Sequence, residues 1–139
     1  MNELLLASPA LVLAVQPAEV EATHETFHAH PNGGGLVAQT AYVAPSVYVG
    51  VDAMVCDRAT VSGNVKLLGR SIIENTATVV GDCELSHETR IGDEAVVIGR
   101  VTLRNHAQIG GTAFVRGIVI IDHFARVDQG VLTGNLAIH

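Results

Sequence analysis

Aliphatic side chains recur at every sixth position over most of the chain, from Val37 to Val127, without an insertion. They are Val37, Val43, Val49, Val55, Val61, Leu67, Ile73, Val79, Leu85, Ile91, Val97, Leu103, Ile109, Val115, Ile121 and Val127. A small residue, such as Ala41 or Ala53, lies two positions before most of them. This alternation predicts short strands in which one small and one branched side chain point inward.

Two positions after many of these aliphatic residues lies a residue that tolerates a positive φ. They are Asp57, Gly63, Gly69, Asn75, Gly81, His87, Asp93, Gly99, Asn105, Gly111, Gly117 and His123. We therefore expect each block of six residues to end in a corner. Three such blocks would close a triangular coil of 18 residues. Coils that stack about 4.8 Å apart would form a prism. The prediction is an all-β, parallel β-helix of nearly six coils over residues 35–139, preceded by an N-terminal cap over residues 1–34.

The repeat resembles the hexapeptide-repeat, left-handed parallel β-helix family, and the resemblance extends from Gly35 to about Val127. It implies a left-handed coil, because spacing alone does not set the hand. It also implies a homotrimer of parallel prisms. The segment 30–35, His-Pro-Asn-Gly-Gly-Gly, together with the uninterrupted blocks, is similar to uncharacterised bacterial and phage proteins.

The composition and charge of the chain exclude some classes of function and favour others. The 139 residues are 48% hydrophobic, which suits a single domain with its own core. A formal charge of -6 with scattered basic residues argues against nucleic-acid binding. The repeat places Cys83 inward and Cys56 outward, so the two cannot form a disulfide, and a cytoplasmic location is expected.

An apolar stretch at residues 4–15 has some features of a signal peptide, but Glu3 precedes it and Pro9 interrupts it. It is too short to span a membrane. Because the open end of a solenoid needs a cover, we expect this stretch to pack on the end of the domain as a strand or short helix. No membrane association is expected.

One outward surface of the predicted prism carries apolar side chains, namely Val80, Val96, Ile98 and Phe114. Such a patch is unusual on the water-exposed face of a monomer. We therefore expect it to form the interface of a homotrimer.

Histidines gather on one predicted corner, in the pairs His87-Glu88, Asn105-His106 and His123-Phe124. Successive pairs lie one coil apart, so His87 and His123 are expected about 10 Å from each other. Two interpretations stay open. In the first, histidine and asparagine are present because they tolerate the left-handed backbone of a corner. In the second, the corner is a binding site for a small ligand, formed by His106, His123 and Asn105.

A local resemblance adds a catalytic hypothesis. Residues 85–93, Leu-Ser-His-Glu-Thr-Arg-Ile-Gly-Asp, are similar to the segment around the catalytic base of hexapeptide acyltransferases of the nucleotide-sugar and lipid A type. The resemblance implies His87 as general base, Glu88 as its orienting partner, and acetyl coenzyme A or another acyl thioester as cosubstrate. The loop that interrupts the coils in those enzymes, their covering C-terminal segment and a basic cluster for the coenzyme's phosphates have no counterpart in the repeat.

A metal site is a third interpretation. The gamma-class carbonic anhydrases share the expected fold and use histidines two coils apart, as His87 and His123 would be. Their further histidine corresponds to Asp128 in this chain, so we expect no metal. Near the N-terminus, His24, His28 and His30 are interpreted as part of a polar strand entering the solenoid rather than as an adventitious metal site.

Taken together, the sequence favours a small trimeric β-helix that acts as a protein-binding or assembly module without catalysis or cofactor. Its acidic surface would suit a protein partner with a basic patch, or a small ligand held between subunits. Acyl transfer by His87 is the alternative. A phage or mobile-element origin, in which the module blocks a host protein, rests only on the similarity of residues 30–35.

Overall fold

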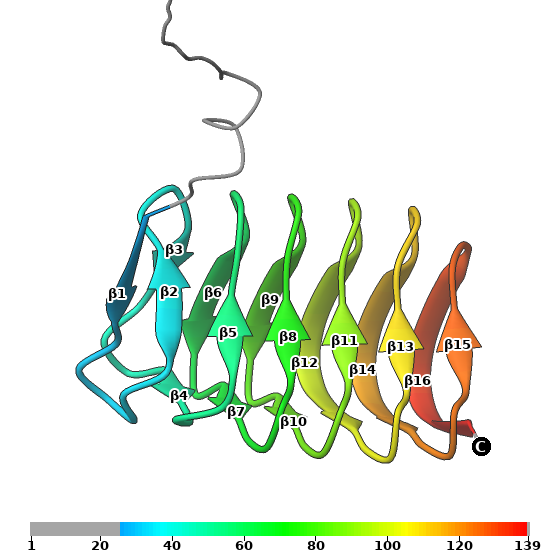
Figure 1. Cartoon of the computed structure of the whole chain (residues 1–139). Coiled ribbons are helices and arrows are strands. Elements are labelled where there is room, and N and C mark those ends of the chain that lie inside the picture. Colours follow the sequence, from blue (N-terminus) through cyan, green and yellow to red (C-terminus); the bar gives the residue numbers. More distant parts are fainter. Residues whose placement is uncertain (1–25, 139) are drawn as a thin grey trace, which may run out of the picture.

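The computed structural model describes residues 26–138, and every regular element among them is a β-strand. The strands stack into a parallel β-solenoid of about six turns, with about 18 residues in each turn. Figure 1 shows the coils side by side along one axis, with β1 at one end and β15 and β16 at the other. This confirms the predicted all-β solenoid. The part of the chain described contains no helix that could cross a membrane.

Two hydrogen-bonded sheets form the three faces of the solenoid. The first, face one, has seven strands: β1 (Phe27–Ala29), β2 (Leu36–Ala38), β5 (Met54–Val55), β8 (Ile72–Ile73), β11 (Arg90–Ile91), β13 (Gln108–Ile109) and β15 (Arg126–Val127). The second has nine: β3 (Tyr42–Val43), β4 (Tyr48–Val49), β6 (Thr60–Gly63), β7 (Lys66–Leu67), β9 (Thr78–Gly81), β10 (Glu84–Leu85), β12 (Val96–Leu103), β14 (Phe114–Ile121) and β16 (Val131–Ile138).

The second sheet folds around an edge of the solenoid and so supplies two faces. Face two comprises β3, β6, β9 and the first halves of β12, β14 and β16. Face three comprises β4, β7, β10 and the second halves of the same three long strands.

The register confirms the predicted inward ladder. Neighbouring coils pair residues 18 apart, as in Ile73 with Ile91 and Ile91 with Ile109, and these side chains are buried. The small residues of the repeat, such as Ala77 and Ala95, fill the other inward positions. Burial of slim aliphatic chains in a stacked column removes apolar surface from water, which is the main favourable term for this fold.

Different residue types form the corners at the three edges of the solenoid. At the aspartate corner, Asn75 Oδ1 accepts a hydrogen bond from the Asp93 N–H at 2.9 Å, and Asp93 Oδ2 accepts one from the Gly111 N–H at 2.8 Å. Each side chain thus ties one coil to the next. At the glycine corner, Gly99 has a φ of 114°, and a Cβ there would lie 2.6 Å from the carbonyl oxygen of Gly117. Gly99 and Gly117 let β12 and β14 continue from face two into face three.

The last coil departs from the period. Phe114 pairs with Val131, which follows it by 17 residues instead of 18. Leu132, which pairs with Val115, therefore occupies the inward position. The shortening follows Val127, where the aliphatic repeat in the sequence ends.

The first coil is covered by chain that precedes the repeat. Strand β1 pairs antiparallel with β2, and buried His30 brings its Nε2 within 2.8 Å of the Val47 carbonyl oxygen. His28 is exposed on β1, while His24 and the apolar stretch expected to pack on the domain lie outside the described residues. Strand β1 and His30 therefore lie against the first coil.

Candidate functional site

The histidine corner joins β10, β12 and β14 to the strands of face one that follow them. His87, Asn105 and His123 each occupy a left-handed conformation, with φ of 63°, 52° and 55°. The pairing of Leu85 with Leu103 and of Leu103 with Ile121 stacks these corners directly above one another. The structure therefore places the predicted histidines on one corner, and it gives their residue types a backbone reason.

A column of side chains runs along the outside of this corner, one residue from each coil. Arg70 Nη1 lies 3.2 Å from a carboxylate oxygen of Glu88, whose other oxygen lies 3.3 Å from His106 Nδ1. The His106 ring in turn stacks on Phe124, with ring centroids 4.6 Å apart. We call Arg70, Glu88, His106 and Phe124 the corner column.

Beneath the corner column lies a buried carboxylate. Asp122 is 3% exposed and accepts hydrogen bonds from Asn105 Nδ2 at 2.7 Å and from the His123 N–H at 2.8 Å. Arg104 forms an ion pair with it at 2.9 Å. Burial acts to raise the pKa of Asp122, but the two hydrogen bonds and the charge of Arg104 outweigh burial and hold the pKa below its ordinary value. Asn105 and His123 are thus engaged in fixing the corner.

The proposed catalytic pair sits at the exposed part of the same corner. His87 Nδ1 lies 3.2 Å from Ser86 Oγ, while the Glu88 carboxylate contacts Arg70 and His106. Among residues 26–138, no group of three or more His, Cys, Asp or Glu side chains is arranged to hold a metal ion. The described corner is therefore a network of ion pairs and stacked rings around an exposed imidazole.

The apolar patch lies on face two. Val80, Val96, Ile98 and Phe114 are half-buried and point outward from β9, β12 and β14. Val96 pairs with Phe114, so the two side chains are neighbours on adjacent strands. Val80 pairs with Ile98 in the same way, so the structure brings these four residues together on one face of the sheet.

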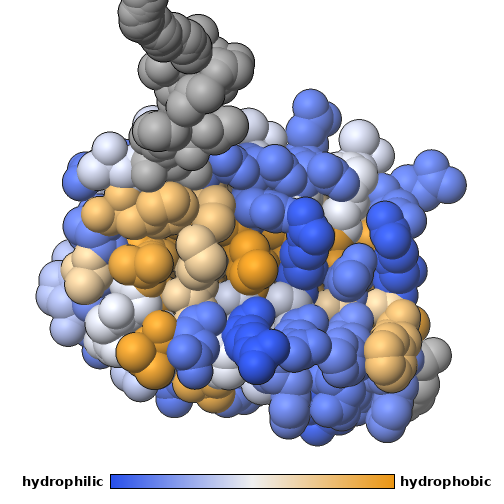
Figure 2. Space-filling model, viewed as in Figure 1, coloured by the Kyte–Doolittle hydropathy of each residue, from blue (hydrophilic) through white to orange (hydrophobic). Residues whose placement is uncertain are grey.

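Face one changes character along the solenoid. Its outward residues over the early coils are apolar, as Leu36, Met54 and Ile72 are, whereas the later coils carry Arg90 and Arg126. Figure 2, which views this face, shows the hydrophobic area over the N-terminal half and the hydrophilic area over the C-terminal half.

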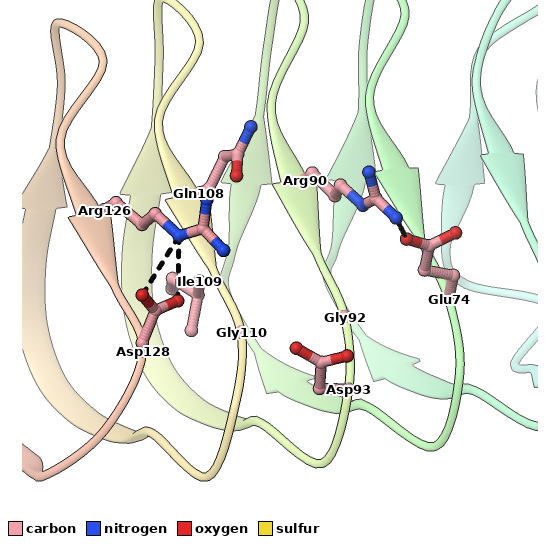
Figure 3. Close-up of a pocket in the computed structure, with 9 residues that line it drawn as sticks. All are labelled: Glu74, Arg90, Gly92, Asp93, Gln108, Ile109, Gly110, Arg126 and Asp128. Atoms are coloured by element: carbon pink, nitrogen blue, oxygen red, sulfur yellow. Dashed lines mark hydrogen bonds and ion pairs between the residues drawn. The ribbon is translucent and has the colours of Figure 1, made fainter.

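A polar hollow of about 380 Å³ lies in the charged half of face one, and sequence reasoning did not find it. Figure 3 shows an ion pair on either side of it, Arg90 with Glu74 and Arg126 with Asp128. The hydrogen bond and charge of Asp128 raise the pKa of Arg126. Its floor has no side chain at Gly110, where a Cβ would lie 3.0 Å from Asp93 Oδ2. The hollow offers donors and acceptors for binding, and its lining residues include no Ser, Thr, Cys, His or Lys side chain.

One signal in the sequence could have indicated this hollow. On face one, the position after the inward aliphatic residue is Glu74, then Gly92 and Gly110, then Asp128, so two bare positions lie between two carboxylates. The depth of the hollow depends on side-chain rotamers, which the period does not give. Comparison of the chain with protein-family models, with curated proteins and with solved structures gives no match.

Proposed function

We propose that the chain forms a homotrimer and that the trimer acts as a binding or assembly module. The observation that carries this proposal is the composition of face two, whose outward positions are uncharged except for Arg116. The remaining outward residues are Tyr42, Thr60, Ser62, Thr78, Val80, Val96, Ile98, Phe114, Val131 and Thr133.

A second copy of the chain is the occupant that fits face two. The chain carries a formal charge of -6, so two copies repel one another through their charged faces. Face two is where copies can meet with least repulsion, and its exposed edges carry Tyr42 at 58% and Val131 at 66% exposure. Apolar burial contributes roughly 25 cal/mol per Å², and a stable interface buries about 1,000 Å² or more. The resemblance to trimeric hexapeptide-repeat proteins supports three subunits.

With face two used for association, face one and the histidine corner stay available to a partner. We infer that the partner is a protein with a basic patch, because the chain is acidic overall. A small ligand held at a subunit boundary by Asn105, His106 and His123 is the second form of this proposal. For both forms we propose a cytoplasmic location, where the thiols of Cys56 and Cys83 would stay reduced.

The experiment is a pair of charge substitutions on face two. Ile98→Glu with Phe114→Glu alters outward side chains only, so we expect folded monomers by light scattering and an unchanged β-type circular dichroism spectrum. The matched control is Met54→Glu with Ile72→Glu, which makes the same kind of change on face one and should leave the trimer intact. If the face-two variant stays trimeric with unchanged stability, face two is not the interface.

One observation keeps acyl transfer as a second candidate. The His87 imidazole is exposed at a corner, and its Nδ1 is positioned by Ser86, which leaves Nε2 directed to whatever binds there. A neutral imidazole in that position could accept a proton as an amine or hydroxyl attacks an acyl thioester. Acetyl coenzyme A is the natural probe for this activity.

A further inference from the structure

The charges that line the polar hollow on face one do not balance. Two of its carboxylates, Glu74 and Asp128, form ion pairs with its two arginines, Arg90 and Arg126. The third carboxylate belongs to Asp93, which forms no ion pair in the part of the chain that the structure describes. The lining therefore carries one negative charge in excess, and a ligand that matches it brings one positive charge.

Asp93 presents one carboxylate oxygen to the hollow. Its Oδ2 accepts the hydrogen bond from the Gly111 N–H at 2.8 Å, whereas its Oδ1 forms no hydrogen bond within residues 26–138. Figure 3 shows this carboxylate between Gly92 and Gly110, neither of which has a side chain to cover it. A primary ammonium is a compact point charge that one oxygen can bind, whereas a guanidinium binds a carboxylate best through two oxygens at once. The single available oxygen therefore favours a primary ammonium.

The opposite side of the hollow offers hydrogen-bond donors. The Nε–H of Arg126 is shared between the two oxygens of Asp128, at 2.9 and 3.0 Å, and the Arg126 Nη groups have no partner among the described residues. The side-chain amide of Gln108 has no partner there either. In Figure 3, both groups lie across the hollow from Asp93. Guanidinium and amide N–H groups of this kind suit a carbonyl oxygen on the ligand.

We propose that the polar hollow receives a lysine side chain of the protein partner. The inference rests on the proposed function, which supplies a partner with a basic patch. The lysine ammonium binds Asp93 Oδ1, and the lysine's main-chain carbonyl oxygen accepts hydrogen bonds from Arg126 and Gln108. The apolar stem of the lysine lies over the bare backbone of Gly110. Both ion pairs of the hollow stay intact, so binding adds the one charge that the lining lacks.

Titration with short blocked peptides, followed through the amide resonances of the full chain, tests the proposal. The probe is acetyl-Gly-Lys-Gly-amide, and two comparison peptides carry arginine or norleucine in place of the lysine. We expect saturable shifts of the Gly110 and Gly111 amide resonances with the lysine peptide. The arginine peptide should bind more weakly, and the norleucine peptide, which lacks the charge, should cause no saturable shift.

Two variants locate the charge that is recognised. Asp93→Asn removes it and keeps the contact between coils, because Asn75 holds the same corner position one coil earlier and makes that contact through its amide oxygen. We expect this variant to bind the lysine peptide about fivefold more weakly. Asp57→Asn is the matched control, because it removes the same charge from the same corner two coils away, outside the hollow. It should leave the affinity unchanged.

The proposal is wrong if the lysine peptide gives no saturable shift, if Asp93→Asn binds it as tightly as the unaltered chain does, or if the arginine peptide binds at least as tightly. Light scattering of the same samples separates this inference from the proposed function. A trimer that does not bind the lysine peptide contradicts the inference alone. A monomer that binds the peptide through Asp93 contradicts the proposed assembly alone.

Discussion

The imidazole of His106 lies flat against the ring of Phe124, with an angle of 1° between the ring planes. Both residues have a positive φ, 69° and 63°, which is costly for side chains of this size. Phe124 is also 74% exposed, so burial does not offset that cost. The stacking contact between the two rings is a favourable interaction that counteracts this cost.

A double-mutant cycle measures this contact. His106→Ala and Phe124→Ala should show a coupling free energy of about 0.5–1.5 kcal/mol, the range of stacked aromatic pairs. The cycle is read from the free energies of unfolding in denaturant for the two single variants and the double variant. Strictly additive effects would show that the rings contribute nothing to each other.

Two buried hydroxyls in the core lack a hydrogen-bond partner. Ser71 Oγ and Thr89 Oγ1 occupy successive inward positions on face one and form no hydrogen bond among the described residues. Thr89→Val replaces a hydroxyl with a methyl group of similar size and should raise the free energy of unfolding by about 1 kcal/mol. Thr76→Val is the matched control, because the exposed Thr76 hydroxyl donates to the Asp93 carbonyl oxygen at 3.1 Å. Loss of stability in Thr89→Val would contradict the assignment.

The two cysteines should differ in reactivity and in their effect on stability. Burial raises the pKa of Cys83 to about 11 from 9.0, so the folded protein keeps its thiol neutral when the unfolded chain has begun to ionise. The contribution of Cys83 to stability is therefore constant below pH 9 and falls as the pH rises from 9 to 11. Cys83→Ala should remove that dependence from urea unfolding curves.

Alkylation checks the same assignment more directly. At pH 8 the folded protein should react through Cys56, which is partly exposed, whereas the denatured chain should react at both thiols. Rapid labelling of Cys83 in the folded protein would contradict its inward position.

Substitution of His87 separates a corner role from catalysis. His87→Asn should leave the melting temperature nearly unchanged, because asparagine accepts the same left-handed conformation. We also expect no binding of acetyl coenzyme A by calorimetry in either form. Saturable micromolar binding together with acyl transfer that His87→Asn abolishes would instead support the acyltransferase alternative, since a general base contributes about 10² to 10⁴ in rate.

Much of the fold could be predicted from the sequence because the spacing of six distinguishes inward from outward positions. Ile91 and Val97 follow that rule, and both are fully buried. The shortened last coil could not be predicted from the aliphatic ladder, which ends at Val127. Gly134, which lies 17 residues after Gly117 and pairs with it, was the available signal.

Contacts between coils were harder to predict than positions on the coil. Glu88 was expected to orient His87, its neighbour in sequence, but its carboxylate contacts Arg70 and His106 one coil away on either side. Side chains at a corner of a solenoid lie near their counterparts about 4.8 Å along the axis. Which of those counterparts they bind depends on rotamers, and so does the shape of the hollow on face one.

The mass of the unaltered chain in solution tests the proposed trimer most directly. Light scattering at micromolar concentration should give three times the chain mass of 14.6 kDa. That mass should persist on dilution, because the interface proposed on face two buries uncharged side chains. A mass of one chain at the same concentration would contradict the trimeric assembly.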